Sequence, residues 1–408
     1  MQNERFDKAA EHTAFCSLNP RSQEFVKTKS LLYRLTFSQI QRLITIAIDL
    51  QMWGEEIQKV WVDESGRDEC LQSLSQAYEE LKNSPKAYPY KVTPEKREVR
   101  FEYIDKAGVG FGTCPVASPK TRCCGLLTLD VYEGCGFDCS YCSIQTFYGG
   151  ALKSDKNFAD KLSRLQLSPD KLYHIGTGQS SDSLMLGNKN GTLEALITFA
   201  AKNPNVILEF KSKSDNVSYL LKNKLPRNII CTFSLNPQAV IDSEEHFTAS
   251  LSGRIKAAKS LSENGVLVGF HLHPMIYFDG WLDEYSRIAD ALTGDFSPQS
   301  VALVSLGTLT FTKPVLRQIR ARAAQSKILQ MPLHESCGKY SYPLDIKEQM
   351  FGGVYRAFEK WHGKVFFYLC MEDKSLWQKV FGYEYESNEA FEENMKKAYM
   401  KKITLFEA

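Results

Sequence analysis

The chain has 408 residues, of which 43% are hydrophobic and 24% charged, and its formal net charge is +2 at pH 7. These values indicate a folded chain with one large domain plus additions, and they give no ground for disorder or for a global attraction to nucleic acid. The polar start at Met1 and the lack of a long apolar run predict a soluble cytoplasmic protein with no membrane partner. The eleven cysteines fit that compartment if they are reduced or metal-bound.

Residues 1–90 are predicted to form a helical N-terminal extension. Thr36 and Gln39 form a possible capping box, and apolar residues then follow along one helical face. These are Phe37, Ile40, Leu43, Ile44, Ala47 and Leu50. A basic recognition helix does not follow, so a helical extension packed on the rest of the chain is favoured over a DNA-binding helix-turn-helix.

The centre of the chain alternates short apolar runs with helical patterns. The six expected strands are Leu126–Tyr132, Leu172–Gly176, Val206–Phe210, Ile229–Leu235, Val266–His271 and Val301–Leu306. The helices expected between them include Gly191–Lys202, Ser250–Asn264 and Leu282–Leu292. Regular alternation implies a parallel sheet that binds its ligands at the carboxyl ends of the strands. The predicted fold is therefore α/β, a partial (β/α)6 TIM-type barrel over residues 91–342.

Three thiols stand in a compact pattern after the first expected strand. Cys135, Cys139 and Cys142 occur as Cys-Gly-Phe-Asp-Cys-Ser-Tyr-Cys, with Tyr141 before the last thiol. Three thiolates hold three irons of a [4Fe-4S] cluster and leave the fourth iron open for a small molecule. A structural zinc site would use four Cys or His ligands. The pattern therefore favours a reactive cluster over three zinc-binding or merely buried cysteines.

This motif resembles the signature of the radical S-adenosylmethionine superfamily, and its surroundings over residues 90–385 look like the spore photoproduct lyase family. The resemblance implies a 5′-deoxyadenosyl radical made by one-electron cleavage of S-adenosyl-L-methionine, with an electron donor such as flavodoxin or ferredoxin. It also implies lyase-type repair of thymine photoproducts in DNA, where the damaged base must leave the stack. A partial barrel is the fold of that superfamily.

Polar residues follow three consecutive expected strands. By resemblance to the lyase family, Ser181, Lys213 and Ser234 match the positions that contact S-adenosylmethionine. Lys213 offers a cation for the carboxylate of that cofactor. The alternative for each residue is an ordinary cap or turn at a strand end.

Two positions depart from the lyase pattern. The repair enzymes place a hydrogen-donating cysteine after the second strand and a tyrosine directly after the last cluster cysteine. Here these positions are Gln179 and Ser143, while Tyr141 is retained. An amide N–H bond is too strong to donate a hydrogen atom as a thiol does, which favours a different substrate.

Further cysteines and histidines leave alternatives open. Cys114, Cys123 and Cys124 lie before the first strand, where they are substitute hydrogen donors, ligands of a second metal, or buried apolar residues. His271 and His273 alternate toward one side of the fifth strand, so one of them is a candidate substrate contact.

Residues 343–408 are predicted to form a C-terminal extension, with a helix over Pro343–His362 and a strand over Val365–Cys370. Three functional hypotheses remain. The first is a radical enzyme of the spore photoproduct lyase type that acts on DNA, and the second is the same machinery with a non-DNA substrate. The third is a non-enzymatic iron–sulfur or zinc protein.

Overall fold

The computed structural model describes residues 2–64, 66–88, 91–93, 98–114, 120–148, 151–322, 324–336 and 338–406. Its central sheet has eight strands in the spatial order β16-β12-β11-β9-β8-β7-β3-β2. Their bounds in chain order are β2 (Phe111–Thr113), β3 (Leu127–Leu129), β7 (Tyr173–Thr177), β8 (Val206–Ser212), β9 (Ile229–Ser234), β11 (Leu267–Met275), β12 (Val301–Thr308) and β16 (Phe366–Leu369).

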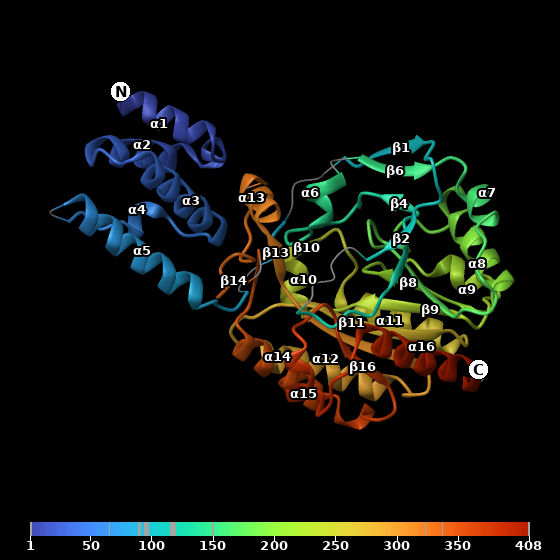
Figure 1. Ribbon diagram of the computed structural model, residues 1–408. Helices are drawn as coiled ribbons and strands as arrows, with labels where there is room; N and C mark the ends of the chain where they lie inside the picture. The colour runs from blue at the N-terminus through green and yellow to red at the C-terminus, as the bar shows by residue number, and fades with distance from the viewer. Residues whose placement is uncertain are drawn as a thin grey trace.

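The six predicted barrel strands are confirmed as β3, β7, β8, β9, β11 and β12. They are parallel, and each pairs with the next one along the chain. The apolar runs explain this arrangement, because every residue of β9 and β12 is buried and strands covered on both faces are mostly apolar. Helices cover the outer face of the sheet (Figure 1).

The first predicted strand is shorter than expected. Its barrel part ends at Leu129, after which the backbone N–H of Asp130 donates to the carbonyl of Gly110. The last predicted residue, Tyr132, instead begins β4 (Tyr132–Glu133), which pairs with β6 (Ala151–Asp155) in a separate sheet that also holds β1 (Arg100–Ile104). An apolar run does not show where a chain changes its pairing partner, so the sequence could not place this break.

The strand predicted over Val365–Cys370 forms β16, but it belongs to the barrel sheet. It pairs in parallel with β12 and extends the sheet by one strand beyond the predicted six. The antiparallel strand β2 extends the other edge against β3. The barrel sheet therefore uses residues from the segment that the sequence assigned to a C-terminal extension.

The predicted helices between the strands are present as α8 (Thr192–Lys202), α11 (Leu251–Glu263) and α12 (Trp281–Asp295). The hydroxyl of Ser250 accepts a hydrogen bond from the backbone N–H of Gly253 at 3.1 Å and so caps the start of α11. The helix ends at Glu263, and Gly265 follows with a φ of +75°. Further elements are α6 (Ile144–Tyr148), α7 (Phe158–Ser163), α9 (Ser218–Lys222), α10 (Gln238–Glu244), α13 (Lys313–Arg322), β5 (Asp138–Cys139) and β10 (Glu245–His246).

The N-terminal residues form helices that lie to one side of the barrel (Figure 1). They are α1 (Gln2–Glu11), α2 (Pro20–Leu32), α3 (Phe37–Trp53), α4 (Ile57–Val60) and α5 (Arg67–Asn83). The predicted capping box at Thr36 and Gln39 is confirmed at the start of α3. Helix α13 contacts both α3 and α6. The predicted domain boundary at residue 90 lies outside the described residues.

The chain ends with α14 (Leu344–Ala357), α15 (Ser375–Phe381) and α16 (Asn388–Leu405). The predicted helix over residues 343–362 is α14 followed by one 3₁₀ turn, Glu359–Trp361. A small sheet joins β13 (Thr310–Thr312), β14 (His334–Ser336) and β15 (Lys339–Ser341). In the part of the chain that the structure describes, no helix has the length and apolarity needed to cross a membrane.

Candidate functional site

The loop with the three predicted cluster cysteines is anchored by a short strand pair. In this pair, β5 lies antiparallel to β10, with Cys139 opposite Glu245 and Asp138 opposite His246. The backbone N–H of Ser140 donates to the carbonyl of Glu244 at 2.8 Å. Because β10 follows β9 and α10, this pairing holds the loop near the carboxyl ends of the barrel strands.

The three thiols lie close enough to act on one another electrostatically. Burial raises the pKa of Cys135 to about 12, and the charges of Asp182 and Cys142 add to this effect. Burial, then the charge of Glu245, raises the pKa of Cys139 well above its usual value. Metal binding at these thiols must therefore release protons.

The chemistry of these donors fits a cluster. In the described residues, no three or more Cys, His, Asp or Glu side chains are arranged around one common metal position. A [4Fe-4S] cluster does not need that arrangement, because each cysteine binds a different iron. Three thiols on one anchored loop, with Lys213 acting on the pKa of Cys135 and Cys139, suit such a cluster.

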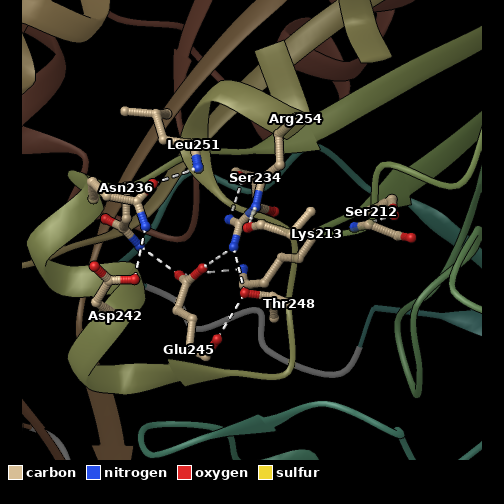
Figure 2. Close-up of polar contacts among 12 residues, drawn as sticks. Ser212, Lys213, Ser234, Asn236, Asp242, Glu245, Thr248, Leu251 and Arg254 are labelled. Atoms are coloured by element: carbon tan, nitrogen blue, oxygen red, sulfur yellow. Dashed lines mark hydrogen bonds and ion pairs between the residues drawn. The ribbon is translucent and has the colours of Figure 1, made fainter. Parts of the chain in front are cut away.

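A buried carboxylate, Glu245, joins the cysteine loop to two neighbouring strand ends, and Figure 2 shows it beside Asn236, Lys213 and Arg254. Its Oε1 accepts hydrogen bonds from the hydroxyl of Tyr141 and from Nδ2 of Asn236, the latter at 2.8 Å. Its Oε2 forms an ion pair with Arg254 at 2.6 Å, and Lys213 Nζ lies 3.9 Å from Oε1. We call these five residues the mouth network. It connects the cysteine loop with the ends of β8 and β9.

The electrostatics of this network keep Glu245 ionised. Burial alone would raise its pKa, but the charges of Arg254 and Lys213 and two hydrogen bonds lower the pKa to about 2. Arg254 is fully buried, and it also donates to the carbonyl of Ser234 at 2.7 Å. A fixed negative charge therefore lies under Lys213 and restrains its ammonium group.

The loop after β7 is held by Asp182. One carboxylate oxygen accepts from the backbone N–H groups of Leu184 and Met185, and the other accepts from the backbone N–H of Lys213 at 2.7 Å. Gly178 has a φ of +83°, and a Cβ there would lie 2.7 Å from Ser183 Oγ. Only glycine suits this position, and the turn fixes where Gln179 lies.

The three residues predicted to contact S-adenosylmethionine lie at the ends of neighbouring strands. Ser181 follows β7, and its shielded hydroxyl has no hydrogen-bond partner among the residues that the structure describes. Lys213 follows β8, where it ends at the mouth network. Ser234 ends β9 and is buried. The structure therefore brings these residues to one edge of the sheet, while their ligand role remains a prediction.

The two predicted catalytic positions have different surroundings. Tyr141 donates its hydroxyl proton to Glu245, and burial followed by the Glu245 charge raises the pKa of Tyr141 well above its usual value. Gln179 is half-buried directly after Gly178, and Ser143 is exposed. Their catalytic roles stay predictions.

Of the two candidate histidines, His271 has a structural place inside the barrel. Its Nε2 lies 2.8 Å from Glu209 Oε1, and its Nδ1 lies 2.5 Å from Ser305 Oγ. Glu209 also contacts His174 Nε2 at 2.8 Å and accepts from Thr232 at 2.7 Å. We call these five residues the inner network. His273 is half-buried nearer the end of β11, so it remains the candidate substrate contact.

The three cysteines noted before the first strand gather near a fourth, Cys370. The pKa of Cys370 is raised to about 12, mainly by burial, and Cys114 and Cys123 contribute to this shift. Cys123 donates or accepts a hydrogen bond with Cys124, which lowers the pKa of Cys123 to about 6. No sequence signal links Cys370 to this group, because it lies about 250 residues further along the chain.

Sequence reasoning missed two of the five mouth-network residues, Glu245 and Arg254, and also Glu244, whose carboxylate accepts from Ser140 of the cysteine loop. Glu244 and Glu245 are two adjacent acidic residues, which usually indicate a solvated surface, and Arg254 lies within a helix. All three are buried. Only long-range packing pairs them, so no local signal could have found them.

Comparison with known proteins addresses the family. The family model described as spore photoproduct lyase matches residues 125–343, which is more than half of the chain. The chain belongs to the spore photoproduct lyase family. The resemblance stated from the cysteine motif is thereby confirmed.

Two curated spore photoproduct lyases show the extent of the likeness. The protein of Clostridium acetobutylicum is 29% identical over 168 residues, which cover 39% of this chain and 49% of the relative. The protein of a Geobacillus species is 27% identical over 222 residues, which cover 51% of this chain and 63% of the relative. The chain thus spans about half to three fifths of these lyases.

Solved structures of spore photoproduct lyase confirm the fold. One, complexed with dinucleoside spore photoproduct, has a TM-score of 0.57 at 20% identity and covers 66% of this chain and 82% of its own. A second, a variant with bound AdoMet and the same dinucleoside, has the same TM-score and identity and covers 69% and 88%. The predicted α/β barrel of the lyase family is therefore confirmed.

Proposed function

We propose that this chain is a radical S-adenosylmethionine enzyme of the spore photoproduct lyase type. Cys135, Cys139 and Cys142 would hold a [4Fe-4S] cluster, and Ser181, Lys213 and Ser234 would contact S-adenosyl-L-methionine. The observation that carries the proposal is the anchored three-cysteine loop beside the ends of three parallel strands. Membership of the lyase family supports it independently.

When bound, the cluster and S-adenosylmethionine together supply the electron transfer that yields the 5′-deoxyadenosyl radical. The residues of the chain would bind and orient the cluster and S-adenosylmethionine. Lys213, held above Glu245, presents a cation for the methionyl carboxylate, and Ser181 offers an unused hydroxyl. The Tyr141–Glu245 hydrogen bond ties the cysteine loop to the same carboxylate. In this proposal the mouth network positions both the cysteine loop and the Lys213 ammonium group that would bind the cofactor.

We propose damaged thymine in DNA as the substrate, because solved relatives carry dinucleoside spore photoproduct. The damaged base must leave the duplex stack to meet a radical inside the barrel mouth. An electron donor such as flavodoxin or ferredoxin is the further partner that this chemistry requires.

Gln179 and Ser143 support a second candidate, the same radical chemistry on a non-DNA substrate. Neither an amide nor a serine hydroxyl returns a hydrogen atom to a carbon radical as a thiol does. The turn at Gly178 fixes Gln179, so another residue of that loop cannot take its place without a change of backbone. The thiols of Cys124 and Cys370, whose pKa values are raised so that they keep their S–H hydrogens, are the alternative hydrogen donors to test.

The experiment is anaerobic reconstitution followed by reduction and addition of S-adenosylmethionine, with and without DNA that carries the spore photoproduct. We expect 5′-deoxyadenosine from the wild type and from Cys16→Ala, which changes an exposed cysteine of the N-terminal helices. We expect none from Cys139→Ala. Absence of 5′-deoxyadenosine from wild type with four irons per chain would overturn the enzyme proposal and favour a non-enzymatic iron–sulfur protein.

A measurement of DNA repair distinguishes the two proposed substrates. Repaired thymine from the wild type, lost in a Cys124→Ser and Cys370→Ser double variant, would support DNA and the alternative thiols. Radical formation with repair only in Gln179→Cys, compared with Gln179→Ser, would favour the non-DNA substrate for the natural chain.

A further inference from the structure

Helix α13 lies between the N-terminal helices and the cysteine loop (Figure 1). Arg320 and Arg322 are two positions apart on this helix. Because each residue turns an α-helix by about 100°, side chains at i and i+2 point to nearly opposite sides. One helix can therefore reach both neighbours.

Toward the N-terminal helices, Arg320 binds a buried carboxylate. Its Nε and Nη2 donate to the two carboxylate oxygens of Asp49 on α3 at 2.7 and 2.8 Å. Asp49 is fully buried and also accepts from the hydroxyl of Tyr78 on α5 at 2.7 Å. This bidentate contact holds α13 against the helical extension.

Toward the barrel, Arg322 binds the cysteine loop itself. Its Nη2 lies 2.5 Å from Oδ1 of Asp138, and both side chains are at least three quarters buried. Asp138 directly precedes Cys139, and α6, which begins two residues after Cys142, contacts α13 as well. The helix therefore supports the loop through Asp138, next to the ligand candidate Cys139.

The segment after α13 repeats this double attachment. The hydroxyl of Ser326 donates to Glu244 Oε2 at 2.6 Å, and the same carboxylate oxygen accepts from Ser140 of the cysteine loop. The backbone N–H of Ser326 donates to the carbonyl of Met52 on α3 at 2.9 Å. Contacts to the extension and to the loop thus alternate over a few residues.

We propose that Arg322 is a positioning residue for the cysteine loop, and that the N-terminal helices act on the cluster site through Asp49, Arg320 and α13. The helical extension is then part of the scaffold of the site. This inference rests on the proposed function for its meaning, because positioning matters only where the loop holds a cluster.

The first test uses the full chain without a cluster. Hydrogen exchange of the backbone amides of residues 138–142 reports how often the loop opens. We expect exchange about ten times faster in Arg322→Ala, since a hydrogen bond between charged groups is lost. Arg322→Lys should restore part of the protection. Arg21→Ala, which removes an exposed ion pair with Glu56 in the same helical region, is the control and should leave the loop unchanged.

Asp49→Asn tests the coupling through α13. We expect faster exchange in the cysteine loop as well as in α3 and α5. An increase confined to the N-terminal helices would overturn the coupling, and unchanged loop exchange in Arg322→Ala would overturn the positioning role.

The second test uses the reconstituted protein and reads the reduction potential. Arg322→Ala removes a positive charge beside Asp138 and Cys139, so we expect a more negative cluster potential, with recovery in Arg322→Lys. An unchanged potential in Arg322→Ala would count against positioning. If the wild type assembled no cluster, the proposed function would fail while the exchange result still decided the coupling.

Discussion

The mouth network and the inner network both hold a buried carboxylate with a lowered pKa, but by different partners. Glu245 is paired with the buried guanidinium group of Arg254. Glu209 is instead contacted by two imidazole rings, of His174 and His271, and by the hydroxyl of Thr232. The Glu245 carboxylate is therefore held mainly by an ion pair beside the cysteine loop, whereas the Glu209 carboxylate is held by hydrogen bonds inside the barrel.

Removal of each carboxylate should show the largest difference. Glu245→Gln leaves Arg254 buried without a counter-charge, so we expect it to cost about 3–5 kcal/mol of unfolding free energy. Glu209→Gln removes a carboxylate whose partner His271 is held neutral, so we expect a smaller loss of about 1–3 kcal/mol. Urea unfolding at pH 7 measures both. Equal losses would break the distinction between the two networks.

The stabilising contribution of the inner network should be lost first as the pH falls. Burial and the charge of Lys211 lower the pKa of His271 to about 4. The unfolded chain takes up this proton from about pH 6.5 downward and the folded chain only near pH 4, so stability falls between these values by about 3 kcal/mol. Unfolding free energies from pH 7 to pH 4 test this, and His271→Gln should flatten that part of the profile.

The mouth network should lose its contribution in a lower pH range. The folded pKa of Glu245 is about 2, below the value of about 4.5 in the unfolded chain, so its contribution is complete above pH 4.5. It is lost as the pH falls toward 2, by about 3 kcal/mol. Acid unfolding of the wild type and of Glu245→Gln measures the difference. A profile for the variant identical to that of the wild type below pH 4.5 would contradict the assignment.

The smallest expected losses of unfolding free energy come from removing a single hydroxyl in each network, and the two losses should be similar. Tyr141→Phe and Thr232→Val each remove one hydroxyl donor to a buried carboxylate, and each should cost about 1–2 kcal/mol. Only Tyr141→Phe disturbs the cysteine loop, so only it should lower the iron retained after reconstitution. Equal iron retention in the two variants would show that the mouth network does not support the loop.

The sequence was sufficient for the barrel strands because their signal is local. Val206 to Phe210 and Val301 to Leu306 are apolar except for Glu209 and Ser305, as is typical of strands covered on both faces. It did not assign β16 to the barrel sheet, because strand pairing depends on which edge is free after folding. The break after Leu129 was missed for the same reason.

For the site, the sequence by itself determined the three cysteines and the polar residues at the strand ends, because spacing and strand position are properties of the chain alone. Only the tertiary structure decided what surrounds them. Glu245, Arg254, Asp49 and Arg322 are charged residues that look like surface until packing removes them from water. Burial turns their charges into strong, directed contacts, and residues from distant segments meet only once the whole chain has folded.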